Sequence, residues 1–167
     1  DCASTRGRWQ SRLGICAKSA TRKRKSASRP MSDELIQQKI ALCEESLTAL
    51  ERIFPATYEG LFSDPLVQPA IERYLQLVVD SAVDCNNLVL EKRGIEKAET
   101  YFGTFTALRD HALLDASLAD QLAPSVGLRN ALVHRYEGID RKRMYESIKR
   151  FLPLYRSYLA GMLKHVS

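Results

Sequence analysis

Apolar side chains recur in alternating steps of four and three residues between positions 36 and 54. Because an α-helix has 3.6 residues per turn, this spacing puts them on one face of a long amphipathic helix over residues 32–54. Such a helix must bury its apolar face against other elements, and Pro55 is expected to stop it. The stripe consists of Ile36, Ile40, Cys43, Leu47, Leu50 and Phe54.

A second helical stripe follows a short loop and runs to residue 89. Asp64 is expected to cap this helix, with Pro65 at its first position and Gly94 just beyond its end. Additional apolar residues widen the stripe, so this helix is expected to be central and to contact neighbours on several sides. The stripe consists of Val67, Ile71, Tyr74, Val78, Ala82, Cys85 and Val89.

The remaining sequence predicts shorter helices and one long final helix. Apolar residues mark short helices near 102–108 and 114–122, and Pro124 is expected to break or kink the run that follows. Asp140 is expected to cap the last helix and Pro153 to bend it. No segment has the two-residue period of a strand. We therefore predict an all-α fold, an antiparallel up-down bundle of four to five helices.

Charge divides the chain into two regions. Residues 1–30 hold nine Lys and Arg against one acid, whereas residues 31–167 hold 16 against 19, a net charge of −3. We expect residues 1–30 to be a basic leader that is disordered or not native to the protein, with Met31 as the native start; the alternative is a basic arm that contacts RNA. Residues 31–167 form the expected domain. Its acidic balance excludes a domain-wide basic surface, so RNA binding would need a local cluster.

The cysteine pattern is typical of a cytoplasmic protein. The four cysteines have no paired short spacing, and Cys43 and Cys85 fall on the apolar faces of predicted helices. Buried, reduced thiols are therefore expected. No apolar run is long enough to span a membrane.

The other titratable residues give no metal or cofactor site. His111 and His165 have no cluster of ligand-type residues at metal-binding spacing, so we assign them to structure or surface. Asp80 and Asp84 are four residues apart on the central helix and could face a cleft, but a structural or solvated role is expected. No Gly-rich phosphate-binding loop occurs. We expect neither a metal nor a cofactor.

The candidate functional residues gather in one segment, as Arg129, Asn130, His134, Arg135 and Tyr136. Metal-free RNA cleavage needs a base for the 2′-OH, an acid for the leaving 5′ oxygen and stabilisation of charge on the phosphorus. Since histidine titrates close to neutrality, His134 can be base or acid. Arg129 can bind a phosphate through two N–H groups and stabilise the transition state, and Asn130 can support it. Tyr136 can donate a hydrogen bond or stack on a base, and Arg135 is a weak RNA-binding candidate.

Helical geometry separates the arginine from the histidine. We expect a helix that carries residues 129–136 and ends at Gly138. On an ideal helix His134 lies about 140° around the axis from Arg129 and shares a face with Asn130. The side chains can converge through their length, through a distorted helix end, or across a two-fold axis between two copies. We prefer the third arrangement, a composite site in a homodimer.

The string Arg-Asn-x-Leu-Val-His-x-Tyr at 129–136, followed by Ile-Asp and a last helix, closely resembles the HepT toxin family of the HEPN superfamily. These toxins are encoded beside small MNT-type nucleotidyltransferase antitoxins. The resemblance covers residues 31–167 in helix order, and residues 1–30 have no counterpart. One departure is Pro124, which would shift the angle at which the motif helix enters.

The resemblance implies a homodimeric, metal-independent endoribonuclease toxin whose motif-bearing helices form an active cleft at the dimer interface. Arg129 and His134 match the family's catalytic pair, and Asn130 matches the polar residue between them. Tyr136 matches the tyrosine to which the antitoxin transfers AMP, which would place an anionic phosphate beside the RNA-binding groups. Cleavage of tRNA is favoured over mRNA. The alternative is a non-enzymatic helical module that binds a nucleotide or substrate for a partner nucleotidyltransferase, a hypothesis that the acidic domain favours.

Overall fold

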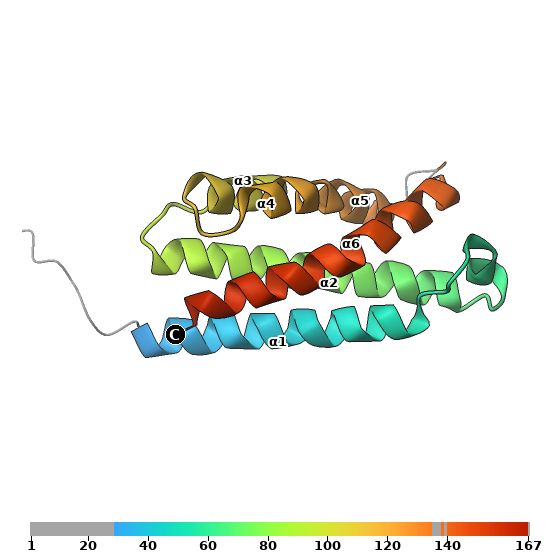
Figure 1. Cartoon of the computed structure of the whole chain (residues 1–167), viewed down its shortest axis with the longest axis horizontal. Coiled ribbons are helices and arrows are strands. Elements are labelled where there is room, and N and C mark those ends of the chain that lie inside the picture. Colours follow the sequence, from blue (N-terminus) through green and yellow to red (C-terminus); the bar gives the residue numbers. More distant parts are fainter. Residues whose placement is uncertain (1–28, 135–137, 139, 167) are drawn as a thin grey trace, which may run out of the picture.

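The computed structural model describes residues 29–134, 138 and 140–166, with side chains from residue 32 onward. These residues form an all-helical bundle without a β-strand (Figure 1). The elements are α1 (Arg29–Ile53), the 3-10 helix η1 (Tyr58–Phe62), α2 (Val67–Lys92), α3 (Tyr101–Asp110), α4 (Ala116–Leu122), α5 (Pro124–Val133), α6 (Arg141–Met162) and the 3-10 helix η2 (Leu163–His165).

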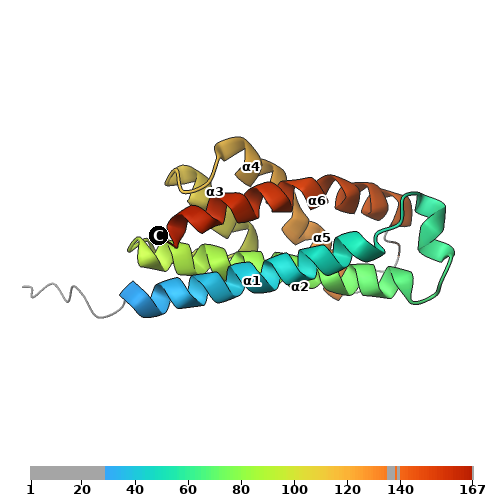
Figure 2. The same cartoon turned by 60° about the horizontal axis from the view of Figure 1, so that its bottom comes forward.

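The bundle is built on an antiparallel pair. α1 and α2 lie side by side along most of their length, and η1 lies in the turn between them (Figures 1 and 2). α4 and α5 follow one another in the same direction and take the place of a third long helix, beside which α3 packs. α6 returns along the bundle and contacts α1, α4 and α5. The predicted all-α up-down bundle is confirmed.

Local signals fix the starts of four helices. Asp140 accepts a hydrogen bond from the N–H of Arg143 (3.0 Å) and caps α6 as predicted. Thr100 and Asp115 cap α3 and α4 in the same way, which satisfies N–H groups that a helix start leaves unpaired. Pro124 is the first residue of α5 and separates it from α4, a position that proline tolerates because no helical bond is lost there.

Two predicted helix starts were wrong. Asp64 does not cap α2, because its carboxylate accepts from the N–H of Leu66 (2.8 Å) and closes a turn before the helix begins at Val67. A short acidic side chain that bonds its own backbone two residues on competes with capping. α1 begins at Arg29, three residues before the predicted start at residue 32, and the proline that follows lies in its first turn, where the missing N–H has no helical partner.

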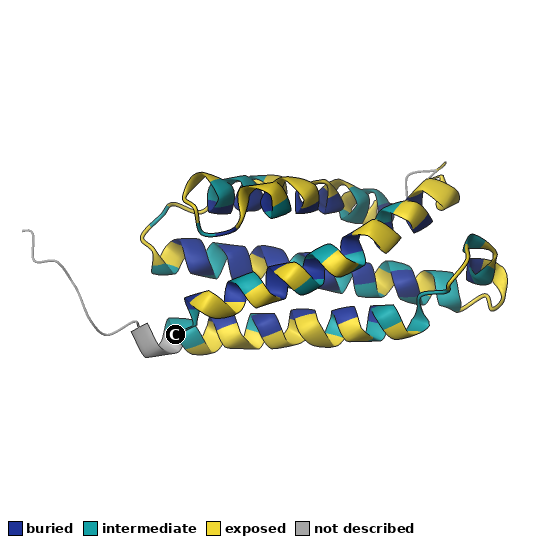
Figure 3. Cartoon of the chain, in the orientation of Figure 1, coloured by how far each residue is buried: buried dark blue, intermediate teal, exposed yellow. Residues whose placement is uncertain are grey.

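The core lies between the long helices and under the α3–α5 layer (Figure 3). Five of the six residues in the first apolar stripe are buried there, namely Ile36, Ile40, Cys43, Leu47 and Leu50. Cys43 and Cys85 are buried free thiols, as predicted. Burial raises the pKa of Cys43 to about 12 and that of Cys85 to about 11, because a thiolate is poorly solvated in an apolar surrounding.

A buried polar network ties α2 to α3 and α6. The hydroxyl of Tyr158 lies 2.7 Å from Oδ1 of Asn86 and 3.0 Å from the carbonyl oxygen of Ala82. The Asn86 amide donates to Oγ1 of Thr104 (3.0 Å), which donates to the carbonyl of Tyr101 (2.7 Å). Because buried polar groups are costly when unpaired, this network fixes how the start of α3 sits on α2.

Pro153 lies inside α6, which runs without interruption from Arg141 to Met162.

Within the part of the chain that the structure describes, no helix is both long and apolar enough to cross a membrane. Residues 1–28 of the predicted leader lie outside the described residues, so the interpretation of that segment stays a prediction.

Candidate functional site

The end of α5 carries the first residues of the candidate motif. Ser125, Val126 and Leu132 turn into the core, and Ser125 Oγ lies 2.7 Å from the Tyr155 hydroxyl of α6. This packing anchors α5 and leaves Arg129 half-buried on its other side. Asn130 is exposed.

The motif helix is shorter than predicted. α5 ends at Val133, and His134 is the residue that follows it, with φ −83° and ψ 2°. The N–H of His134 still bonds to the carbonyl of Asn130 (3.0 Å), so it closes the last turn, and its side chain is exposed. The expectation of one helix through residues 129–136 was therefore wrong. A β-branched residue and a histidine are both weak helix formers, which favours an early end.

Arg129 is held by an acidic side chain from another helix. Its Nε lies 2.8 Å from Oδ1 of Asp80, and its Nη2 lies 3.2 Å from Oδ2. The arginine side chain is 18% exposed and the aspartate side chain 35% exposed. A two-point arginine–carboxylate pair of this kind fixes both the position and the plane of the guanidinium group.

Two further contacts complete the surroundings of the guanidinium group. Nη1 donates to Oδ1 of Asn130 (3.3 Å), and the group lies over the Tyr101 ring, 5.4 Å from its centroid. Three of the five N–H groups of Arg129 thus have acceptors. Within the described residues the other two have no protein acceptor. They can bind an anion, and Arg129 is already oriented to do so.

The sequence did not reveal what orients Arg129. Asp80 was expected to be structural, and Tyr101 was not singled out. Asp80 lies 49 positions before Arg129, so no local spacing links them. Asp84, which lies one helical turn after Asp80, pairs instead with Lys39 of α1, and its Oδ2 is 2.6 Å from Nζ. Arg135 and Tyr136 lie outside the described residues, and their predicted roles stay predictions.

The Asp80 carboxylate borders open space. Asp80 lines a hollow of about 490 Å³ between α1 and α2, together with Leu42, Leu77 and Ser81. The Leu42 side chain is half exposed there. The pair formed by Asp80 and Arg129 thus lies at the surface of the bundle, where a large substrate can reach it.

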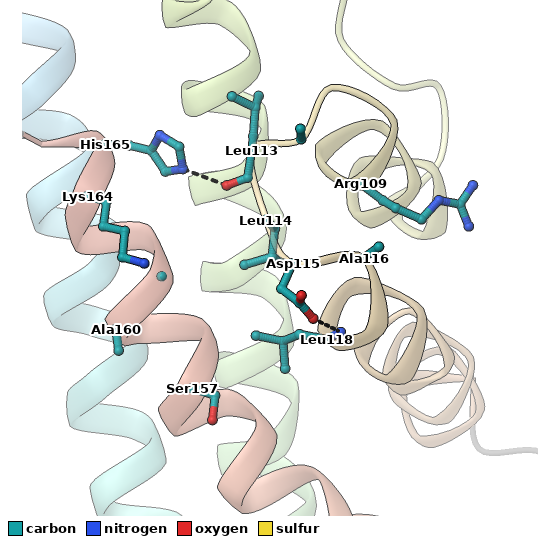
Figure 4. Close-up of a pocket in the computed structure, with 12 residues that line it drawn as sticks. Arg109, Leu113, Leu114, Asp115, Ala116, Leu118, Ser157, Ala160, Lys164 and His165 are labelled. Carbon is teal, nitrogen blue, oxygen red and sulfur yellow. Dashed lines mark hydrogen bonds between the residues drawn. The ribbon is translucent and has the colours of Figure 1, made fainter.

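A larger hollow, of about 770 Å³, lies at the other end of the bundle and holds no motif residue (Figure 4). The buried His165 borders this hollow. Its Nε2 lies 2.8 Å from the carbonyl oxygen of Leu113, and its Nδ1 lies 3.4 Å from Nη2 of Arg93. This agrees with the structural role predicted for His165. The described residues contain no group of three or more His, Cys, Asp or Glu side chains placed to hold a metal ion.

Comparisons with known proteins match this sequence and this fold to one family. The family model described as "Ribonuclease HepT-like" matches residues 43–162. The "tRNA nuclease HepT" of Aphanizomenon flos-aquae is 34% identical over 125 residues, which span 75% of this chain and 85% of that protein.

The fold is shared with solved toxin structures. The tri-AMPylated HEPN toxin of Shewanella oneidensis, solved in complex with an MNT antitoxin, superposes with a TM-score of 0.71 at 20% identity, over 78% of this chain and 98% of that chain. A MntA–HpeT toxin–antitoxin structure with a tyrosine-to-alanine substitution superposes with a TM-score of 0.70 at 18% identity, over 78% of this chain and 98% of that chain. Sequence and fold together show that the chain belongs to the HepT-like ribonuclease family.

Proposed function

We propose that the protein is the toxin of a toxin–antitoxin pair and cleaves RNA, with tRNA preferred over mRNA, without a metal ion. Its membership of a ribonuclease family and its relative named a tRNA nuclease support this proposal. The observation that carries it is the oriented guanidinium group of Arg129, five residues before His134, with two N–H groups left for an anion.

The proposed reaction starts from the 2′-OH of the RNA. A base takes its proton, the 2′ oxygen bonds to the adjacent phosphorus, and the bond from phosphorus to the 5′ oxygen breaks. The leaving 5′ oxygen takes a proton from an acid, which leaves a 2′,3′-cyclic phosphate and a 5′-OH. A homodimer supplies two imidazoles, so His134 of one protomer can act as the base and the partner's His134 as the acid.

Arg129 stabilises the charge that develops on the phosphate. One N–H on each Nη atom is left unused by Asp80 and Asn130. These two N–H groups face the phosphate oxygens, whose negative charge increases as the 2′ oxygen attacks. Because Asp80 fixes the guanidinium group beforehand, no reorientation is needed during the reaction. Asn130 supports Arg129 through its Oδ1 atom, 3.3 Å from Nη1.

Control of the toxin is proposed to act through Tyr136. An MNT-type nucleotidyltransferase antitoxin would transfer AMP from ATP to its hydroxyl oxygen and release pyrophosphate. The bulky anionic group, two residues from His134, would then repel the phosphate of incoming RNA. The solved relatives described as an AMPylated HEPN toxin with an MNT antitoxin, and as a toxin–antitoxin pair with a tyrosine replaced, support this proposal.

The test is cleavage of purified tRNA in EDTA. The wild-type protein should produce fragments that end in a cyclic phosphate. His134→Ala should lose activity by about 10²-fold or more, the usual contribution of a general acid or base. His111→Ala is the matched control, because His111 is an exposed histidine just after α3, and it should cut normally. Equal activity of wild type and His134→Ala would refute the proposal.

A further inference from the structure

The first part of α6 concentrates positive charge that the rest of the domain lacks. Residues 141–150 hold five Lys and Arg against one acid, whereas the remainder of residues 31–167 holds 11 against 18. All five side chains belong to exposed residues. We name this group the α6 basic patch; it consists of Arg141, Lys142, Arg143, Lys149 and Arg150.

These cations differ from most others in having no acidic partner within the part of the chain that the structure describes. Among the described residues, no ion pair includes a member of the α6 basic patch. Elsewhere acidic side chains neutralise the cations that they contact, so those cations add little to the field outside the protein. The ion-paired cations are Lys39, Lys92, Lys97, Arg109, Arg129 and Arg156.

Aromatic rings hold part of the patch in place without removing its charge. The guanidinium group of Arg141 lies 5.9 Å from the ring centroid of Phe62, and Nζ of Lys149 lies 5.8 Å from that of Tyr145. The guanidinium group of Arg150 lies 5.2 Å from the ring of Phe151. Contacts of this type limit the motion of a long side chain and leave its charge available.

The position of the first three cations is unfavourable for the helix itself. Arg141, Lys142 and Arg143 are the first three residues of α6. The partial positive charge at a helix N-terminus favours acids there and disfavours cations. A sequence that violates a local stability rule without a structural gain indicates a functional requirement. Here the required function is the binding of an anion large enough to contact several cations.

The patch lies beside α5, the helix that carries Arg129. A hollow of about 290 Å³ is lined by Leu128, the residue before Arg129, and by Arg143 and Ser147 of α6. Lys149 and Arg150 each lie seven residues after Lys142 and Arg143, which puts them on the same helix faces about 10 Å further along. Lys142 and Lys149 thus form one row along α6, and Arg143 and Arg150 form a second row about 100° around the helix.

We infer that the α6 basic patch binds the phosphate backbone of the RNA on one side of the bond that is cut. This inference rests on the proposed function and names a binding surface beyond the motif. RNA is favoured as the occupant because its phosphates repeat along a chain, as do these cations, which have no ion pair among the described residues.

The test compares two double variants with equal changes in charge. Lys142→Gln/Arg143→Gln removes two patch cations whose side chains have no hydrogen bond or ion pair with any other described residue. The control, Arg73→Gln/Lys164→Gln, removes two exposed cations outside α6 that also have no ion pair among the described residues. Both are made on a His134→Ala background, so that bound RNA stays intact, and binding of one labelled tRNA in EDTA is measured at several salt concentrations.

The patch variant should bind tRNA about tenfold more weakly than the control, and its plot of log affinity against log salt should be shallower by about 1.4 to 1.8, the contribution of two phosphate contacts. Its melting temperature should equal or exceed that of the parent, because the removed cations oppose the helix dipole. A purely structural role for these residues would lower that temperature instead.

Cleavage separates this inference from the proposed function. With an active His134, the patch variant should show a raised KM for tRNA and a normal rate on a short oligonucleotide that contains the cleaved bond. If the patch variant binds and cuts tRNA as the control does, the inference is wrong and the proposed function stands. If the wild-type protein neither binds nor cuts tRNA, both fail.

Discussion

Asp80 on α2 accepts two hydrogen bonds from Arg129 on α5, with Oδ1 2.8 Å from Nε and Oδ2 3.2 Å from Nη2. The aspartate thus determines which edge of the guanidinium group remains for a substrate. The relationship crosses 49 positions of sequence and joins two helices that are packed against one another. It makes the central helix part of the candidate site.

Replacing Asp80 should slow cleavage without unfolding the protein. Asp80→Asn keeps the size of the side chain but removes the charge and one acceptor oxygen, so Arg129 loses its fixed plane. We expect kcat to fall by about 10²-fold, the effect of a small misplacement of a catalytic group. Asp84→Asn, one turn further along α2 and paired only with Lys39, is the control. Equal losses in both variants would contradict a positioning role for Asp80.

Tyr136 should be the residue that the antitoxin modifies. After coexpression with an MNT-type nucleotidyltransferase, intact-mass and peptide mass spectrometry should find added AMP on the wild-type protein and none on Tyr136→Phe, because the variant lacks the acceptor oxygen. Tyr101, an exposed tyrosine near Arg129, is the control position, and Tyr101→Phe should still be modified. AMP found on Tyr136→Phe at the wild-type level would refute this assignment.

The Tyr158 hydroxyl should be important for stability. Tyr158→Phe leaves the buried Oδ1 of Asn86 without its hydrogen-bond donor. We expect the free energy of unfolding in urea to fall by about 1–3 kcal/mol, the cost of an unsatisfied buried polar group. Tyr74→Phe, on the partly exposed side of α2, should change it by less than about 0.5 kcal/mol. A similar effect of the two substitutions would show that the buried network is not responsible.

Alkaline pH should destabilise the fold through Cys43. The pKa of this thiol is raised from 9.0 to about 12 in the folded protein. Its contribution to stability is therefore complete below pH 9 and is lost as the pH rises from 9 towards 12, because only the unfolded chain releases the proton in that range.

Melting temperatures between pH 8 and pH 11 will measure this effect. Cys43→Ala should be less stable than wild type at pH 8, since it leaves a small cavity, but it should lose less stability as the pH rises. The limit for one group is about 1.4 kcal/mol per pH unit. Parallel pH curves for the two proteins would exclude Cys43 as the cause.

Patterns that act within a few residues predicted most of the fold. The apolar stripe from Ile36 to Leu50 is buried as expected, because helical periodicity alone decides which face turns inward. Asp140 caps α6 and Pro124 begins α5 for equally local reasons. Asp64 shows the limit of such reasoning: two local bonding patterns compete for its carboxylate, and the sequence does not say which is favoured.

The candidate site depended on information that is not local. The motif identified Arg129 and Asn130, and the structure joins them by a hydrogen bond. The pairing of Arg129 with Asp80 follows from the packing of α5 against α2. No periodicity in the chain encodes a contact between a residue of the second long helix and one of the fifth helix.

The pairing of Arg129 with Asp80 has a consequence for how RNA is captured. At a distance the two opposite charges act as a dipole, whose attraction for a polyanion fades much faster than that of a single charge and is further screened by salt. Arg129 therefore contributes little to the rate at which RNA arrives, and it acts at contact range, after the RNA has arrived. Cations without acidic neighbours then supply the long-range attraction of RNA. Capture of RNA and catalysis can therefore change independently through separate substitutions.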